Sequence, residues 1–431
     1  MNKDTINILC KQFDVKKEII TYVMDQENKI KSKFKDIDDM KEYNQYKVLN
    51  AMQQAKLNST HFNWTTGYGY GDIGRDKVEE IYSNVFKAED ALVRPTIVSG
   101  THAISLTLSA ILRPNDEMIS ITGAPYDTLQ TVIGIKGDAK GTLKDYGISY
   151  KGVPLTDDDK INIKGVLNTI SDKTKLILIQ RSTGYSDRRA ILIDEIKKAI
   201  SAIKGYDKNI ICMVDNCYGE FIDKIEPIEV GADVIAGSLI KNPGGGLALT
   251  GGYVAGNKDI IELVANKSTA PGVGKECGLT FGTTRNTLQG FFMAPKVVSE
   301  ALKGALLTAA VYKSLGFRVI PDVEDKRSDI IQGVELRSKE RIIKFCQGIQ
   351  YASPVDSYVA PNPWAMPGYE DEVIMAAGGF IEGSSIELSA DGPIREPYIA
   401  YYQGGLTYEH CKIGVMKSLN NLYINNLVKL K

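Results

Sequence analysis

The sequence predicts an α/β fold, with a mainly parallel sheet in a large domain and a smaller α+β domain at the C-terminus. The chain has 431 residues, which is more than one hydrophobic core usually holds, so we expect two domains. Between residues 61 and 305, short apolar runs alternate with helical segments. Alternation of this kind predicts parallel strands that are covered by helices.

Three regions follow from this pattern. Residues 1–60 carry apolar residues at helical spacing among charged ones and predict an N-terminal helical arm. Residues 61–305 form the predicted large domain, and residues 306–431 form the small one. The apolar runs that predict strands are 96–98, 118–121, 176–179, 210–214 and 234–235. The expected helices are 101–112, 190–204 and a long helix over 287–314 that links the domains.

The composition excludes several classes of protein. Hydrophobic residues make up 43% and charged residues 24%, and the net charge of -1 gives no field that favours nucleic acid or an anionic membrane. The N-terminus lacks the apolar core of a signal peptide, and no apolar stretch is long enough to span a bilayer. Six scattered cysteines and three histidines predict reduced thiols, no metal site and a cytoplasmic location.

Two segments carry residues with reactive side chains. The apolar run 210–214 ends at Asp215, and the segment around Ile235 leads to Lys241, which precedes a run of three glycines. Pyridoxal phosphate (PLP) needs such a pair, because a lysine amine forms a Schiff base with its aldehyde and an acid keeps its pyridine nitrogen protonated. We also expect Lys241 to act as a general base, with a pKa lowered by burial and a nearby cation. The alternative is a solvated lysine and a helix-capping aspartate.

Other polar residues lie in predicted turns. Ser99, Gly100 and Thr101 stand between a strand and a helix, where backbone N–H groups bind phosphate or merely form a capped turn. Tyr126 follows the strand 118–121 and either stacks on a flat cofactor or is a half-buried turn residue. Arg395 lies among turn residues and either binds a substrate carboxylate in a bidentate manner or is solvated.

Taken in order, these segments resemble the PLP-dependent cystathionine and methionine lyase family, and within it the branch of aluminium resistance proteins. The resemblance covers nearly the whole chain beyond the N-terminal arm. The motifs are TGYGYGDIGR (66–75), SGTHAI (99–104), GAPYDTL (123–129), QRSTGY (180–185), VDNCYGEF (214–221), GSLIKNPGGG (237–246) and ELSADGPIREPY (387–398). The resemblance implies the aminotransferase-like fold of PLP enzymes (fold type I), with a seven-stranded sheet in the large domain and PLP as the cofactor.

The resemblance also implies roles for individual residues. Lys241 would form the Schiff base, Asp215 would pair with the pyridine nitrogen, and Tyr126 would stack on the ring. The residues implied for the phosphate are Ser99, Gly100, Thr101 and Ser238, together with Tyr70 and Arg75 from the neighbouring subunit. Arg395 would hold the substrate carboxylate, with Arg181 as the second candidate. The family forms dimers or tetramers with shared active sites, so we expect a homodimer or homotetramer.

The chain departs from the family pattern where substrate would bind. Ile240 precedes the lysine where the family has a hydroxyl residue, Cys217 replaces another hydroxyl, and residues 180–185 replace a Glu-Ser-Pro-x-Asn-Pro segment. We expect β- or γ-elimination on a sulfur-containing amino acid. The alternatives are transamination, racemisation or retro-aldol cleavage, or a PLP-binding stress-response protein with little catalysis.

Overall fold

The computed structural model describes residues 1–366 and 369–430. The chain divides into two compact units. The large unit is Tyr43–Pro295, and the small unit combines Met1–Glu42 with Lys296–Lys431. The sequence treats residues 1–60 as a separate arm, whereas the structure groups the first part of this region with the C-terminal residues. The domain boundaries at residues 60 and 305 stay a prediction.

The sheet of the large unit places the strand ends that carry the candidate site. Its strands are β1 (Asp90–Arg94), β2 (Glu117–Ser120), β3 (Ser149–Gly152), β4 (Thr174–Gln180), β5 (Ile211–Asp215), β6 (Val234–Ser238) and β7 (Gly252–Gly256). They lie in the order β1-β7-β6-β5-β4-β2-β3, and β7 alone among them runs against its neighbours. The predicted mainly parallel seven-stranded sheet is therefore confirmed.

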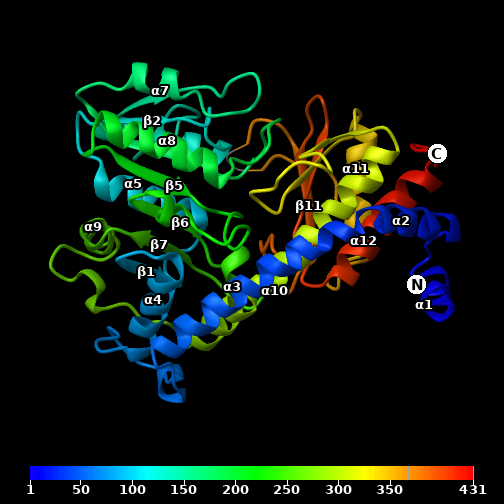
Figure 1. The fold of residues 1–431 in the computed structure, drawn as a ribbon, viewed down its shortest axis with the longest axis horizontal. Coiled ribbons are helices and arrows are strands. Elements are labelled where there is room, and N and C mark those ends of the chain that lie inside the picture. The colour runs from blue at the N-terminus through cyan, green and yellow to red at the C-terminus, as the bar shows by residue number, and fades with distance from the viewer. Residues whose placement is uncertain (367–368, 431) are drawn as a thin grey trace. The chain divides into compact units, whose positions relative to one another are not determined.

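Helices cover both faces of this sheet (Figure 1). The helices within the large unit are α4 (Ile73–Phe86), α5 (Gly100–Ile111), α6 (Asp127–Ile133), α7 (Ile163–Thr169), α8 (Ile193–Tyr206) and α9 (Lys258–Ser268). α5 and α9 share an apolar cluster with Val254 of β7. The ring centroids of Tyr82 and Phe86 on α4 lie 6.0 and 5.2 Å from that of Tyr253. Because residues 253 and 254 point to opposite faces of the sheet, α4 covers the face that α5 and α9 do not.

Short 3₁₀ helices and two long helices complete the description. The 3₁₀ helices are η1 (Lys31–Lys33), η2 (Ser59–Phe62), η3 (Lys144–Tyr146), η4 (Pro227–Val230), η5 (Asn242–Gly244) and η6 (Gly274–Glu276). α3 (Phe34–Gln54) and α10 (Thr284–Ser314) each cross the limit between the units. α10 confirms the long helix predicted over 287–314, and it contains Pro295 at the limit of the large unit.

Three strands differ from the sequence prediction. The strand expected at 96–98 is wrong: β1 ends at Arg94, and Pro95 begins a turn because its ring fixes φ and removes an N–H donor. β7 was not predicted, since its sequence GYVAG has a glycine at each end and little apolar bulk. β3 was not predicted either, because its sequence SYKG is mostly exposed at the sheet edge and lacks an apolar run.

The small unit is built on an antiparallel sheet in the order β10-β11-β12-β9-β8. Its strands are β8 (Arg318–Ile320), β9 (Gln332–Glu335), β10 (Val373–Ala377), β11 (Ser389–Pro393) and β12 (Ile399–Gln403). Its helices are α1 (Lys3–Lys11), α2 (Lys17–Ile30), α11 (Lys339–Gln350) and α12 (Tyr408–Ile424). Ile19, Ile20 and Val23 of α2 share one buried apolar cluster with α11 and α12, which explains why the N-terminal residues belong to this unit.

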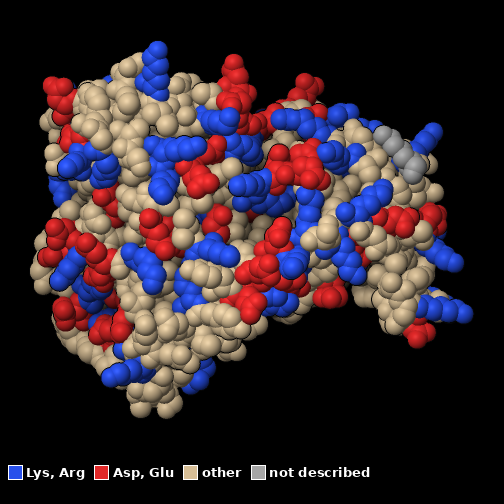
Figure 2. All heavy atoms as spheres, viewed as in Figure 1, with Lys and Arg blue, Asp and Glu red and all other residues tan. Residues whose placement is uncertain are grey.

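The described surface carries charges of both signs. Figure 2 shows Lys and Arg interspersed with Asp and Glu across the face that it draws. This mixture agrees with a net charge near zero. A search of the described helices found none with the length and apolar content needed to cross a bilayer.

Candidate active site

The parallel pairing of three strands brings the candidate residues to one edge of the sheet. Gln180, the last residue of β4, pairs with Asp215, and Asp215 pairs with Ala236 of β6. β6 continues to Ser238, and Lys241 follows it. In open parallel sheets, ligands bind beyond the carboxyl ends of the strands. The structure therefore places Asp215, Ser238 and Lys241 at the edge where a ligand is expected.

Asp215 is a buried acid with one fixed hydrogen bond. Its side chain is 2% exposed, and Oδ1 accepts from the backbone N–H of Cys217 at 3.1 Å. Burial is the largest influence and raises the pKa of Asp215, while Lys241 and the Cys217 amide act in the opposite direction. A cationic partner beside this carboxyl would favour its ionised form. A protonated pyridine nitrogen is such a partner.

Lys241 lies over an aromatic ring close to several acidic groups. Its Nζ is 3.9 Å from the ring centroid of Tyr218. Burial alone would lower the pKa of Lys241, but Cys217, Tyr218 and Asp215 raise it well above its ordinary value. The lowered lysine pKa expected from the sequence is therefore wrong for the PLP-free chain. The cause is that acidic groups, and not a cation, dominate its surroundings.

The start of α5 forms a close-fitting corner beside these residues. Ser99 caps the helix, and its Oγ accepts from the backbone N–H of His102 at 3.0 Å. A Cβ added to Gly100 would lie 3.0 Å from Cys217 Sγ and 3.4 Å from Ser238 Cβ. Glycine therefore lets the start of α5 approach Cys217 and Ser238 closely, and the first N–H groups of a helix have no partners within it. Anions bind readily at such a terminus, so this corner fits a phosphate group.

Tyr126 joins the helix start to the central strands. Its Oη donates to Thr101 Oγ1 at 3.1 Å, and its backbone N–H donates to Gln180 Oε1 at 2.9 Å. Burial is the largest influence and, with Asp215, raises the pKa of Tyr126 well above its ordinary value. The phenol therefore stays protonated.

These residues together fit PLP. Lys241 is the amine for the aldehyde, Asp215 is the acid for the pyridine nitrogen, and the α5 corner with Ser238 suits the phosphate. The fit rests on the close approach of the start of α5 to Ser238 and on the chemistry of the side chains. Their assignment as cofactor ligands remains a prediction.

Arg181 is enclosed by the segment that follows β5. It is fully buried, and its Nη1 and Nη2 donate to Asn216 Oδ1 at 2.9 Å and to Asp223 Oδ2 at 2.7 Å. Glu226 adds a carboxylate oxygen 3.7 Å from Nη1. Through these contacts Arg181 stabilises the segment that follows Asp215. Its role as a substrate-carboxylate ligand stays a prediction, and this geometry does not favour it.

Tyr70 lies in the loop that precedes α4, and Arg75 lies in the first turn of α4. Tyr70 is 66% exposed, and its ring centroid lies 5.8 Å from that of Tyr68. Arg75 is buried, and its Nη1 donates to the carbonyl oxygens of Gly69 at 2.8 Å and Gly278 at 3.3 Å. Arg75 therefore fixes the loop that presents the two tyrosines. Contact of either predicted residue with a partner subunit's phosphate stays a prediction.

Arg395 lies in the small unit, between β11 and β12. Its side chain is 43% exposed and forms an ion pair with Asp371 at 3.1 Å. A substrate carboxylate would have to displace this aspartate from the guanidinium. The carboxylate-binding role of Arg395 stays a prediction.

The sequence reasoning missed three residues around the lysine. The ring of Tyr218 lies against the amine of Lys241. Asn242, the next residue after the lysine, and Glu220, in the segment after β5, are both buried. The motif VDNCYGEF contains two of them. The closeness of Tyr218 and Glu220 to Asp215 in the sequence could have indicated a role in the site. The direction in which a turn residue points, however, cannot be predicted from a periodic pattern.

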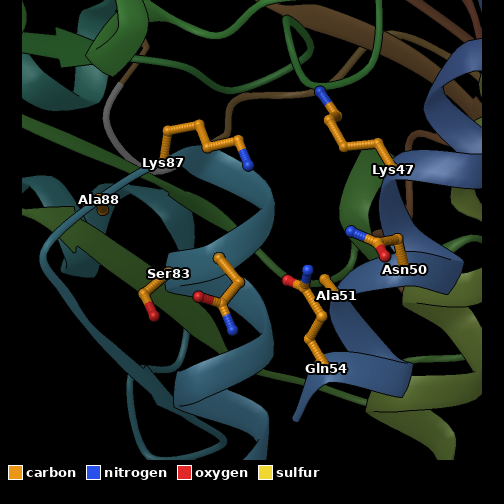
Figure 3. Close-up of a pocket in the computed structure, with 8 residues that line it drawn as sticks. Lys47, Asn50, Ala51, Gln54, Ser83, Lys87 and Ala88 are labelled. Atoms are coloured by element: carbon orange, nitrogen blue, oxygen red, sulfur yellow. The ribbon is translucent and has the colours of Figure 1, made fainter.

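A cavity elsewhere in the large unit contains none of the predicted site residues. It has a volume of about 260 Å³ and lies between α3 and the end of α4. Figure 3 shows Lys47, Asn50 and Gln54 on one side, facing Ser83 and Lys87 on the other. Among the described residues, no cluster of three or more His, Cys, Asp or Glu is arranged to hold a metal ion.

Comparison with known proteins shows the family. The profile of methionine gamma-lyase matches residues 19–423. The chain belongs to the methionine gamma-lyase family. This confirms the resemblance drawn from the motifs, and it makes the chain an enzyme of the carbon–sulfur lyase class.

Individual relatives support this membership. A carbon–sulfur lyase involved in aluminum resistance from Clostridium novyi is 50% identical with a TM-score of 0.94, covering 98% of this chain and all of that one. The uncharacterized protein YnbB of Bacillus subtilis is 52% identical over 94% of this chain and 96% of its own length. An O-acetylhomoserine (thiol)-lyase candidate from Campylobacter jejuni, which contains a pyridoxyl-lysine, is 16% identical with a TM-score of 0.54; the match covers 81% of this chain and 88% of that one. This last likeness shows the fold alone.

The corner at Gly100 gives a direct test of the phosphate site. Gly100→Ala places a Cβ against Cys217 and Ser238. The start of α5 must then shift by a few tenths of an ångström. A shift of the backbone N–H groups that bind the phosphate weakens hydrogen bonds worth about 1–3 kcal/mol, so we expect PLP affinity to fall by roughly 5- to 150-fold. Titration of the PLP-free protein with PLP, followed by absorption, measures this.

Gly205→Ala is the matched control, because a Cβ added to Gly205 on α8 meets nothing within 4 Å. The control should bind PLP like the wild type. Equal affinity in Gly100→Ala and Gly205→Ala would contradict a phosphate site at the start of α5.

Proposed function

We propose that the chain is a PLP-dependent lyase that cleaves a carbon–sulfur bond of a sulfur-containing amino acid by β- or γ-elimination. The observation that carries the proposal is the placement of Asp215 and Lys241 at one sheet edge, beside the start of α5, which Gly100 lets approach Ser238 closely. When bound, PLP supplies an electron sink that stabilises negative charge on the substrate α-carbon. Membership of the methionine gamma-lyase family supports the reaction class.

Each residue of the proposed site has a separate role. Lys241 would hold PLP through Nζ, and the same Nζ would accept the α-proton of the substrate. Asp215 would hold the pyridine nitrogen in its protonated form, since the burial of Asp215 makes a cationic partner strongly favourable. Tyr126 would pack on the ring, and its hydrogen bond to Thr101 fixes its orientation. Arg395 is the proposed ligand of the substrate carboxylate.

We also propose a cytoplasmic location, which the unpaired cysteines support. The six cysteines are all free, and four of them are buried. Free thiols persist in the cytosol, where glutathione keeps them reduced.

A panel of sulfur-containing amino acids tests the proposed function. Cystathionine, methionine, cysteine and homocysteine are incubated with the PLP-loaded protein, and thiol and oxo acid are measured separately. We expect at least one substrate to yield both products in equal amounts, and Lys241→Ala to yield neither, because no other residue described here supplies the amine. Oxo acid without thiol would indicate transamination and would contradict the lyase proposal.

We also propose that the active enzyme is a homo-oligomer in which Tyr70 enters the site of the neighbouring subunit. The exposure of Tyr70 and the fixing of its loop by Arg75 support this arrangement. A mixture of inactive Tyr70→Phe and inactive Lys241→Ala subunits should regain about a quarter of the activity or less, because only one hybrid site in a dimer holds both native residues. Subunit exchange is verified with tagged chains. Complete exchange without any recovery would contradict a shared site.

A further inference from the structure

The turn that follows β5 determines where Lys241 lies. Tyr218 and Phe221 both have a positive φ, of 70° and 64°, so the chain reverses sharply between them. Asn242 Nδ2 donates to the carbonyl oxygens of Tyr218 and Glu220, each at 3.0 Å. The residue next to Lys241 is thereby clamped to the turn that places the Tyr218 ring under its amine.

The side chain of Glu220 anchors this turn to the sheet. It is fully buried, and its Oε1 accepts from Tyr253 Oη at 2.8 Å. Tyr253 lies on β7 and pairs with Gly237 of β6. A Cβ added to Gly237 would lie 2.8 Å from Glu220 Oε1, so this glycine makes room for the carboxyl group.

The surroundings of Glu220 are aromatic. The ring centroids of Tyr82 and Phe86 lie within 6.0 Å of that of Tyr253, and Phe221 and Phe291 belong to the same cluster. Among the described atoms, Glu220 Oε2 and Tyr82 Oη are buried without a hydrogen-bond partner. An unpartnered buried carboxylate would be far more costly than an unpartnered neutral acid.

The charge state of Glu220 follows from this environment. Burial is the largest influence and raises the pKa of Glu220 to about 8. The hydrogen bond from Tyr253 and the charge of Lys241 act to lower it, and Glu226 acts to raise it further. Burial raises the pKa of the Tyr82 phenol well above its ordinary value, and a charge on Glu220 would raise it further.

We propose that Glu220 is a positioning residue for Lys241, which holds residues 216–221 in place as a neutral, hydrogen-bonded carboxylic acid. This inference rests on the proposed function, because it concerns the lysine of the same site. In this proposal Glu220 contacts neither substrate nor cofactor. It acts through the turn, through the Tyr218 ring and through the clamp made by Asn242.

The protonated state is tested first in the PLP-free protein. Infrared difference spectroscopy between wild type and Glu220→Gln at pH 6.5 should show the loss of one protonated carboxyl band. Glu117→Gln is the matched control, since Glu117 is also buried, but Lys151, Thr174 and Ser171 lower its pKa. Its replacement should remove an ionised carboxylate band instead. Loss of an ionised band in Glu220→Gln would overturn the proposal.

Stability against pH gives a second readout without PLP. The folded pKa of Glu220 lies above its unfolded value, so the wild type loses stability as pH rises between about 4.5 and 8. Glu220→Gln lacks this titration. The melting temperature of Glu220→Gln relative to wild type should therefore rise with pH over this window, and a difference that stays flat would contradict the neutral acid.

Positioning is tested in the PLP-loaded enzyme with the best substrate of the panel. Glu220→Leu removes the anchor and should lower kcat by about 10- to 100-fold with little change in KM, because small displacements of a reacting group have effects of this size. Glu220→Gln keeps an acceptor for Tyr253 and should restore most of the loss. Full activity in Glu220→Leu would overturn the positioning role. Absence of turnover in the wild type would count against the lyase proposal, while the PLP-free readouts would still judge the charge state.

Discussion

The parallel pairing of β4, β5 and β6 is the constraint on which the candidate site depends. Parallel strands end at a common edge, so Asp215 and Lys241 come together although 25 residues separate them in the chain. The sheet interior then buries Asp215, and burial makes this acid require a positive partner. A cofactor with a protonated ring nitrogen would be such a partner, and Lys241 is the proposed ligand of its aldehyde.

The polar residues around this pair hold backbone segments in place as well as lining the site. Arg181, which follows β4, holds the segment after β5 through Asn216 and Asp223, and Asn242 holds the lysine next to the turn 216–221. Buried groups of this kind have their charges or hydrogen bonds matched by specific partners, because the interior offers no water to replace them. The contacts of Arg181 therefore fix the segment after β5, and those of Asn242 fix the loop that carries Lys241.

The fold and the two principal residues could be predicted because they depend on local patterns. Apolar runs showed β2, β4, β5 and β6, and the residues at their ends followed directly. β7 could not be predicted from its small residues, and β1 was displaced because Pro95 ends the strand before the apolar run 96–98. The roles of Arg181 and Glu220 depend on contacts with Asp223 and Tyr253, which lie 42 and 33 positions away. No spacing rule shows such pairs, and the positive φ of Tyr218 and Phe221 decides the direction of the turn between them.

Chemical mapping of the cofactor lysine tests the central claim most directly. The full-length protein is saturated with PLP, reduced with borohydride and digested, and the modified peptide is identified by mass spectrometry. The account predicts one pyridoxyl group per chain, on the peptide that contains Lys241. A stoichiometric pyridoxyl group on any other lysine, with Lys241 unmodified, would contradict it.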